Sequence, residues 1–139
     1  MKTVKSAITA LVCGLLLAST ACKKKEVNLG TPPTINLKTG NGYLANNDTV
    51  NAGDTVIMGV TASANYAPDK LQRLIIRRSI NFADLMTLKQ IDIGEDQNET
   101  YSGDFKFVLQ TVGNQQYTFI VENTHGLEGE VLLTVTVTP

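Results

Sequence analysis

Apolar residues recur at every second position through most of the chain after Pro33, and this period constrains the fold more than any other feature. In the clearest run, residues 55–64, the even-numbered positions are Val, Met, Val, Ala and Ala. Successive side chains of a β-strand point to opposite faces, so this pattern predicts strands with one buried face. The same alternation marks the runs 34–38, 105–109, 117–121 and 131–137.

Segments rich in Gly, Asn and Asp separate these runs, as turns between short strands require. They lie at residues 40–42, 46–48, 52–54, 95–99, 112–114 and 123–126. A chain of 139 residues has room for one domain of ordinary size. Short strands at regular spacing therefore predict an all-β fold, a single antiparallel β-sandwich of about seven strands over residues 33–139.

The stretch from Leu71 to Ile93 fits two readings. At helical spacing several apolar residues would share a face, but Arg78 falls in the middle of it. The β-branched content favours a strand over Leu71–Arg78, a connection at Asn81–Asp84 and a second strand over Met86–Ile93. A helical turn at residues 82–86 stays open as the alternative.

The N-terminus has the three parts of a secretory signal peptide. Lys2 and Lys5 precede an apolar run from Ala7 to Ala18, and Ser19-Thr20-Ala21-Cys22 follows. A helix rises about 1.5 Å per residue and a bilayer core is about 30 Å thick, so this run is short for a membrane span. We therefore expect residues 1–21 to be removed.

The segment Ser19 to Cys22 resembles the lipobox of bacterial lipoproteins, in a form with Ser19 in place of the usual leucine that is similar to Bacteroidetes lipoproteins. The resemblance implies that Cys22 is acylated and becomes the new N-terminus. An ordinary signal peptide cut near Ala21, leaving a free thiol, is the alternative. With Cys13 removed and Cys22 acylated, the mature chain would contain no thiol for a disulfide.

Residues 22–32 are predicted to form a lipid-anchored tether to the membrane. Lys23, Lys24 and Lys25 follow the cysteine, and each can contribute about 1 kcal/mol near anionic headgroups, or can simply keep a linker soluble. Residue 23 is not the aspartate that retains related lipoproteins at the inner membrane, so the resemblance implies the outer membrane. Surface-exported lipoproteins of this type carry acidic residues here, and the lysines favour the periplasmic face.

Two further segments resemble immunoglobulin-like modules of bacterial envelopes, including polycystic-kidney-disease-type (PKD) domains. One is Asn51-Ala52-Gly53-Asp54-Thr55-Val56, which opens a strand, and the other is the hairpin sequence from Tyr117 to Gly126. The resemblance implies an immunoglobulin-like sandwich in which the hydroxyl of Tyr117 ties a corner. It implies a fold and no chemistry.

The composition excludes several classes of function. Twelve basic and 13 acidic residues give a net charge of −1, which argues against a nucleic-acid binder. One histidine and two cysteines leave little material for metal or nucleophilic chemistry, and neither a serine elbow nor a phosphate-binding loop is present. We predict no enzymatic activity and no cofactor, with His125 as a turn residue.

Three sets of residues remain as candidate sites of modification or ligand binding. Asp48-Thr49-Val50 and Asp54-Thr55-Val56 resemble the O-glycosylation signal of Bacteroidetes envelope proteins, or are plain strand-edge residues. Arg73 and Arg77 either form an ion pair with Glu122 on a neighbouring strand or bind an acidic ligand. Loop carboxylates could hold calcium or simply be polar turn residues; they are Asp92, Glu95, Asp96, Glu99 and Asp104.

These observations favour a non-enzymatic lipid-anchored envelope protein whose domain serves protein binding or structural display. The alternative is a glycan-binding accessory lipoprotein of a polysaccharide-uptake system. Sugar platforms depend on exposed aromatic residues, and the chain offers Tyr43, Tyr66 and Tyr101. Tyrosines on one face would favour a glycan, and scattered tyrosines would favour a protein partner.

Overall fold

The structure, a computed structural model, describes residues 30–40 and 42–139. The predictions for the signal peptide, Cys22 and Lys23–Lys25 lie outside the described residues. Eight strands and one 3₁₀ turn, η1, form the described part. They are β1 (Thr34–Leu37), β2 (Asp48–Asn51), β3 (Thr55–Ser63), β4 (Leu71–Ile80), β5 (Met86–Asp92), η1 (Glu95–Gln97), β6 (Thr100–Val108), β7 (Gly113–Asn123) and β8 (Glu128–Thr138).

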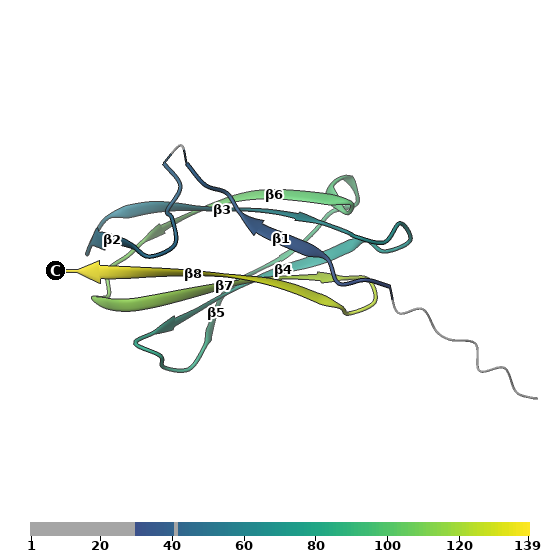
Figure 1. The fold of residues 1–139 in the computed structure, drawn as a ribbon. Coiled ribbons are helices and arrows are strands. Elements are labelled where there is room, and N and C mark those ends of the chain that lie inside the picture. Colours follow the sequence, from purple (N-terminus) through teal and green to yellow (C-terminus); the bar gives the residue numbers. More distant parts are fainter. Residues whose placement is uncertain (1–29, 41) are drawn as a thin grey trace, which may run out of the picture.

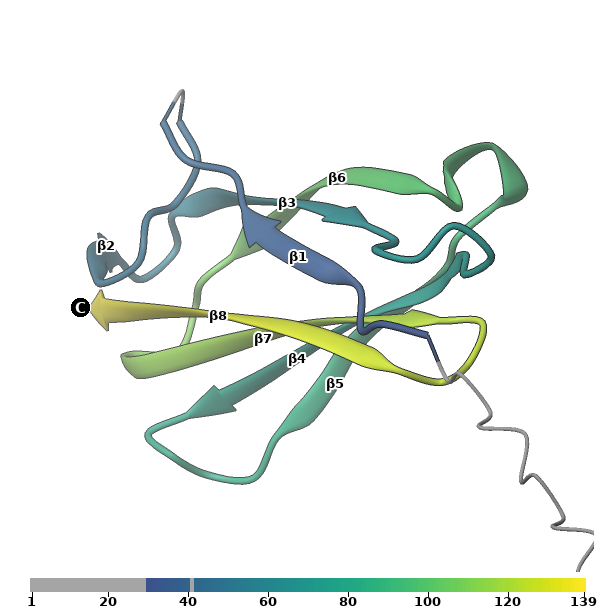
Figure 2. The ribbon, with the colours of Figure 1, turned by 45° about the vertical axis from the view of Figure 1, so that its right-hand side comes forward.

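The strands form two sheets, one of order β1-β3-β6 and one of order β2-β8-β7-β4-β5 (Figure 1). The predicted all-β sandwich is therefore confirmed. Two details differ: there are eight strands, and β2 pairs with β8 in the parallel sense. After β1 the chain crosses to the opposite sheet, where it forms the four-residue strand β2, and it then returns to the first sheet as β3 (Figure 2).

The ambiguous stretch forms an antiparallel hairpin, which confirms the strand prediction for residues 71–93. Residues 81–85 connect β4 to β5, and they begin with a tight turn in which the Ala83 N–H donates to the Ile80 carbonyl at 3.0 Å. Asn81 and Phe82 occupy its two central positions with φ of 49° and 61°. No helical turn forms over residues 82–86.

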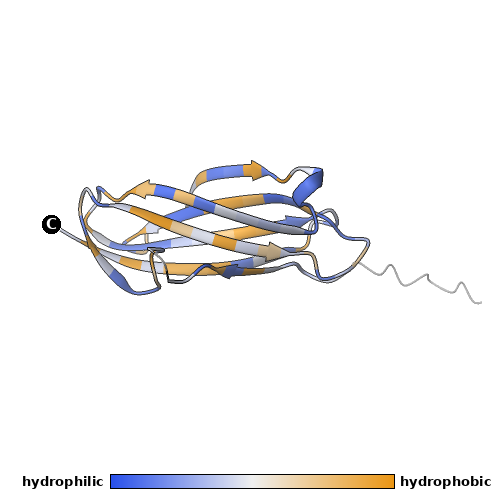
Figure 3. Ribbon diagram, turned by 90° about the horizontal axis from the view of Figure 1, so that it is seen from above, coloured by the Kyte–Doolittle hydropathy of each residue, from blue (hydrophilic) through white to orange (hydrophobic). Residues whose placement is uncertain are grey.

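The core fills the space between the sheets, where the alternating apolar residues meet; Figure 3 shows the resulting bands of hydrophobic and hydrophilic residues along the strands. Phe105 of the three-stranded sheet contacts Phe119 of the five-stranded sheet, with ring centroids 6.2 Å apart. Both are buried, as are Met58 and Val60 of β3. Among the described residues no helix has the length and apolarity to cross a bilayer.

Tyr117 lies in this core, and burial raises the pKa of its phenol. Its hydroxyl donates to Gln115 Oε1 at 2.8 Å, and the Gln115 amide donates to the Thr111 carbonyl at 2.5 Å. The tyrosine therefore secures the β6–β7 connection through the side chain of Gln115.

Candidate functional site

The β4–β5 turn, residues Asn81–Met86, is the most unusual surface of the described chain, and we call it the tip. Phe82 is 89% exposed, Met86 59% and Leu85 52%. Three large apolar side chains on one short turn are rare on a surface that has no partner. Phe82 also has the positive φ that favours glycine or asparagine, which costs on the order of 1 kcal/mol for a bulky residue.

Hydrogen bonds hold the tip against the start of β7. The Asn81 N–H donates to the Asn114 carbonyl at 2.7 Å, and Asn81 Oδ1 accepts from the Asn114 N–H at 3.0 Å. Ser79 Oγ donates to the Ala83 carbonyl at 2.7 Å. Beside Phe82 lies a small hollow of about 230 Å³, floored by Gln115 and other polar residues of β7 and β8.

The arginines of β4 divide into paired and unpaired groups. Arg73 Nη2 lies 3.0 Å from Glu122 Oε2, so the predicted cross-strand ion pair forms. Arg77 is opposite Thr118 and Thr87, and its guanidinium has no hydrogen bond or ion pair with another described residue. Arg77 therefore places an unpaired positive charge on the strand that leads to the tip.

We expect Phe82→Gly to leave the fold intact and to stabilise it by up to about 1 kcal/mol, because glycine adopts this φ without strain. Chemical denaturation of the two proteins measures the difference. Asp84→Gly is the matched control, since Asp84 is not among the residues with positive φ. There the more flexible unfolded chain should lower stability. A loss of stability in Phe82→Gly as large as in the control would contradict the strain argument.

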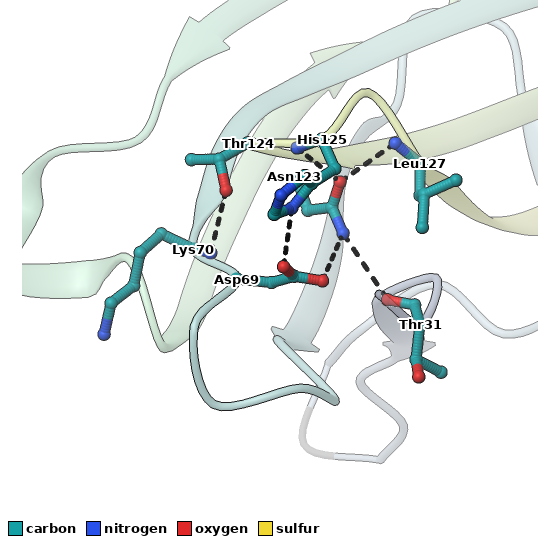
Figure 4. Close-up of polar contacts among 7 residues, drawn as sticks. All are labelled: Thr31, Asp69, Lys70, Asn123, Thr124, His125 and Leu127. Carbon is teal, nitrogen blue, oxygen red and sulfur yellow. Dashed lines mark hydrogen bonds and ion pairs between the residues drawn. The ribbon is translucent and has the colours of Figure 1, made fainter. Parts of the chain in front are cut away.

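At the opposite end of the sandwich, Asp69 is a buried carboxylate with a side chain 0% exposed. Its Oδ2 accepts from Asn123 Nδ2 at 3.1 Å, and its Oδ1 lies 2.6 Å from His125 Nδ1 (Figure 4). Oδ1 depends on this contact, because it has no hydrogen bond to any other described group. Asn123 Oδ1 in turn accepts from the His125 and Leu127 N–H groups at 3.0 and 2.9 Å, which shapes the β7–β8 turn.

This cluster, which we call the clasp (Asp69, Asn123 and His125), also holds the segment through which the chain reaches β1. Asn123 Nδ2 donates to the Thr31 carbonyl at 3.4 Å. Gly30 has φ of 81° and packs so closely on Asp69 that a Cβ there would collide with Oδ2. His125 is the predicted turn residue, but its contact with Asp69 was not predicted. The two lie far apart in sequence, and Asp69 follows Ala67-Pro68 like an ordinary turn residue.

A polar cluster lies on the outer face of the three-stranded sheet. Asp104 Oδ1 accepts from Lys38 Nζ at 2.7 Å and from the Tyr43 hydroxyl at 3.1 Å. Gly59 lies beneath them, where a Cβ would meet all three side chains. The Lys38 hydrogen bond holds the pKa of Asp104 below its ordinary value.

Lys38→Met is expected to return the pKa of Asp104 towards its ordinary value, as followed by NMR titration. A lowered carboxyl pKa means that the ion pair contributes to stability at neutral pH and that this contribution is lost as the pH falls through that pKa. Lys70→Met is the control: it should raise the pKa of Glu99, which Lys70 lowers, and leave Asp104 unchanged. An Asp104 pKa unaltered in Lys38→Met would exclude this cause.

The three candidate tyrosines do not share a face. Tyr43 lies on the outer face of the three-stranded sheet, Tyr66 lies in the β3–β4 connection, and Tyr101 is 9% exposed within the core. A shallow hollow of about 530 Å³ is lined mainly by polar residues such as Asn36, Thr61 and Ser102, and the largely buried Tyr101 also contributes to it. It presents no exposed aromatic ring, and the arrangement expected of a sugar platform is not met.

The loop carboxylates do not converge on one point. Glu99 pairs with Lys70 at 2.6 Å and Asp104 with Lys38 at 2.7 Å. In the part of the chain that the structure describes, no three His, Cys, Asp or Glu side chains gather as a metal site. The calcium hypothesis for residues 92–104 gains no support from this geometry.

The two Asp-Thr-Val segments adopt the same local structure. Asp48 Oδ2 accepts from the Ala45 N–H at 2.7 Å, and Asp54 Oδ2 accepts from the Asn51 N–H at 2.9 Å, so each aspartate closes a turn. The following Thr49 and Thr55 are exposed at strand starts. Both hydroxyls are accessible, and glycosylation of either stays a prediction.

No protein-family model matches the sequence, and no curated protein matches it. Solved structures share its fold at low sequence identity. A variant of the superoxide reductase (neelaredoxin) of Ignicoccus hospitalis superposes with a TM-score of 0.56 at 13% identity, covering 76% of this chain and 80% of that one.

Two further structures are similar to this chain. The CARDB domain of a Pyrococcus furiosus protein has a TM-score of 0.51 at 15% identity, with 76% of this chain and 94% of that one covered. A DUF4466 family protein from Parabacteroides merdae has a TM-score of 0.52 at 12% identity, with 75% and 44% covered. At these identities the likeness shows the fold alone.

Proposed function

We propose that this protein is a non-enzymatic binding module of the cell envelope, anchored by lipid at Cys22, whose tip docks a partner protein. The observation that carries the proposal is the tip itself. Phe82 is held in a strained conformation with 89% of its surface exposed, beside exposed Leu85 and Met86. Strain of this kind persists where the surrounding structure imposes it, and it is concentrated at functional sites.

The position of the tip supports the same reading. The chain reaches β1 beside Asn123, at one end of β7, whereas Asn81 of the tip bonds to Asn114 at the other end. The 11 residues of β7 span on the order of 35 Å. In Figure 1 the tip therefore lies at the end far from residue 30, so an anchor at Cys22 would leave it accessible.

The chemistry of the tip defines the partner. Aromatic and methionine side chains at the centre of a contact bind apolar pockets, with methionine adapting to their shape. The unpaired Arg77 on the same hairpin complements a carboxylate at the rim of such a pocket. We expect another envelope protein with an apolar pocket and an acidic rim, and the scattered tyrosines remove the observation that would have favoured a glycan.

A photo-crosslinking residue in place of Phe82 tests the docking surface in intact cells. We expect a discrete adduct with a second protein, which disappears when Leu85→Ser and Met86→Ser are added. The control is the same crosslinker in place of Glu128, which is exposed and pairs with Glu122 at the end of β7 opposite Asn114 and the tip. Equal adducts from both positions, or none from the tip, would refute docking through this surface.

The anchor has its own test, the intact mass of the full chain from the membrane fraction, with and without protease treatment of whole cells. Acylated Cys22 as the N-terminus is the expected result. Protection from protease would support the periplasmic face of the outer membrane, which Lys23–Lys25 favour, and cleavage would support the surface. A mass without acyl chains would exclude the anchor and leave the docking proposal to the crosslinking experiment.

A further inference from the structure

The two sheets end in four edge strands, and three of them are protected against pairing with another chain. The strands β1 and β2 are only four residues long. The third, β5, has a register shift: Ile76 pairs with Lys89 but Arg77 pairs with Thr87, so Leu88 has no partner. Short length and bulges are two of the devices, together with charged side chains, by which natural sheets prevent edge-to-edge association.

The fourth edge strand, β6, is long and has no bulge, and its two charged residues, Asp104 and Lys106, are of opposite sign. Its nine residues pair with β3 without interruption, and no described strand lies beyond it. Two hydrogen bonds just beyond its ends show which residues face β3. The Ala64 N–H donates to the Glu99 carbonyl at 2.9 Å, and the Leu109 N–H donates to the Asp54 carbonyl at 3.1 Å.

In an antiparallel pair the backbone groups of alternate residues face the partner strand. The odd-numbered residues of β6 therefore bond to β3. The N–H and carbonyl groups of the even-numbered residues, 100 to 108, point to the open edge.

We propose that β6 is the contact surface for a second copy of this chain, joining two three-stranded sheets into one sheet of six. Closed symmetry requires a two-fold axis, and a two-fold axis makes the two β6 strands antiparallel. When the axis passes through Phe105, Asp104 of each copy lies opposite Lys106 of the other. This register forms two pairs of opposite charge between the copies. If the axis passed through Asp104 or Lys106 instead, that residue would lie opposite the same residue of the second copy, and two like charges would meet.

The side chains needed for this contact are available. Lys38 and Tyr43 both bond to Oδ1 of Asp104, which leaves Oδ2 for a cation of the second copy. Lys106 is exposed and has no ion pair within the described residues. The antiparallel arrangement places the two residues numbered 30 at opposite ends of the pair. From Cys22 to Gly30 the chain can span at most about 30 Å, so two anchors reach one membrane when the strands lie along it.

Zero-length carbodiimide crosslinking of the full chain in mild detergent tests the register. An equal mixture of ¹⁴N- and ¹⁵N-labelled protein should give a mixed-isotope crosslink between Asp104 and Lys106. The Lys38–Asp104 crosslink within one chain is the internal control, because those atoms are 2.7 Å apart. A Lys38–Asp104 product without any mixed-isotope product would overturn the proposal.

Sedimentation equilibrium of variants tests the strand contact itself. Ser102→Pro removes an edge-facing N–H without removing a bond to β3, so we expect a folded monomer. Gln90→Pro on β5 is the matched control, and it should leave the dimer intact. Lys106→Glu should raise the dimer Kd by about tenfold, and adding Asp104→Lys should restore it. A wild-type chain that stays monomeric, or a Lys106→Glu chain that dimerises equally well, would refute the proposal whether or not the proline variant folds.

Discussion

Replacing Phe119 with alanine is expected to destabilise the domain by about 3–5 kcal/mol. Phe119 is fully buried on the central strand β7, and its ring contacts Phe105 across the two sheets at 6.2 Å. Removing it leaves a cavity between sheets that no disulfide within the described residues holds together. The denaturant midpoint of the full chain, followed by circular dichroism, measures the loss.

Phe107→Ala serves as the control, because Phe107 is only half-buried at the edge of the core. It should cost clearly less than Phe119→Ala, since fewer contacts are lost and the cavity opens to solvent. Phe82→Gly, at the tip, should cost nothing. Equal losses at positions 119 and 107 would mean that the sheets can close over the cavity and that the core is not held by this aromatic contact.

Asp69→Ala is expected to cost about 2–4 kcal/mol, although Asp69 contributes no apolar surface. The carboxylate is completely buried, and its removal leaves one N–H of the buried Asn123 amide without an acceptor and takes from the half-exposed His125 its ion-pair partner. A buried polar group without a partner has lost its hydrogen bonds to water, and no hydrogen bond within the protein replaces them. Thermal unfolding of the variant measures the loss.

The clasp argument also predicts where the damage appears. Because Asn123 holds the Thr31 carbonyl and Gly30 packs on Asp69, protease should cut near residues 30–33 faster in Asp69→Ala than in the wild type. Asp69→Asn keeps the shape and one acceptor oxygen, so it should show smaller changes in both measurements. A stable Asp69→Ala chain with unchanged cleavage would show that the clasp has no structural role.

The strands were predictable because period-two alternation is a local property that burial on one face imposes on each strand separately. Residues 55–63 show this directly, since the even positions 56 to 62 are all buried and, of the odd positions, only Gly59 is. The pair of Arg73 and Glu122 was predictable as well, because the fold class implies which strands are neighbours. The short strand β2 was missed, since four mostly polar residues carry no alternation.

The candidate sites depended on contacts that no local pattern contains. The sequence by itself determined an all-β sandwich with a core of alternating apolar residues, because burial of one strand face repeats along the chain. Only the tertiary structure decided that Asp69 meets His125, that Phe82 is strained and exposed, and that β6 is the long edge strand without a bulge. These features arise where segments distant in sequence come together, and there the partner of a side chain is a consequence of the fold.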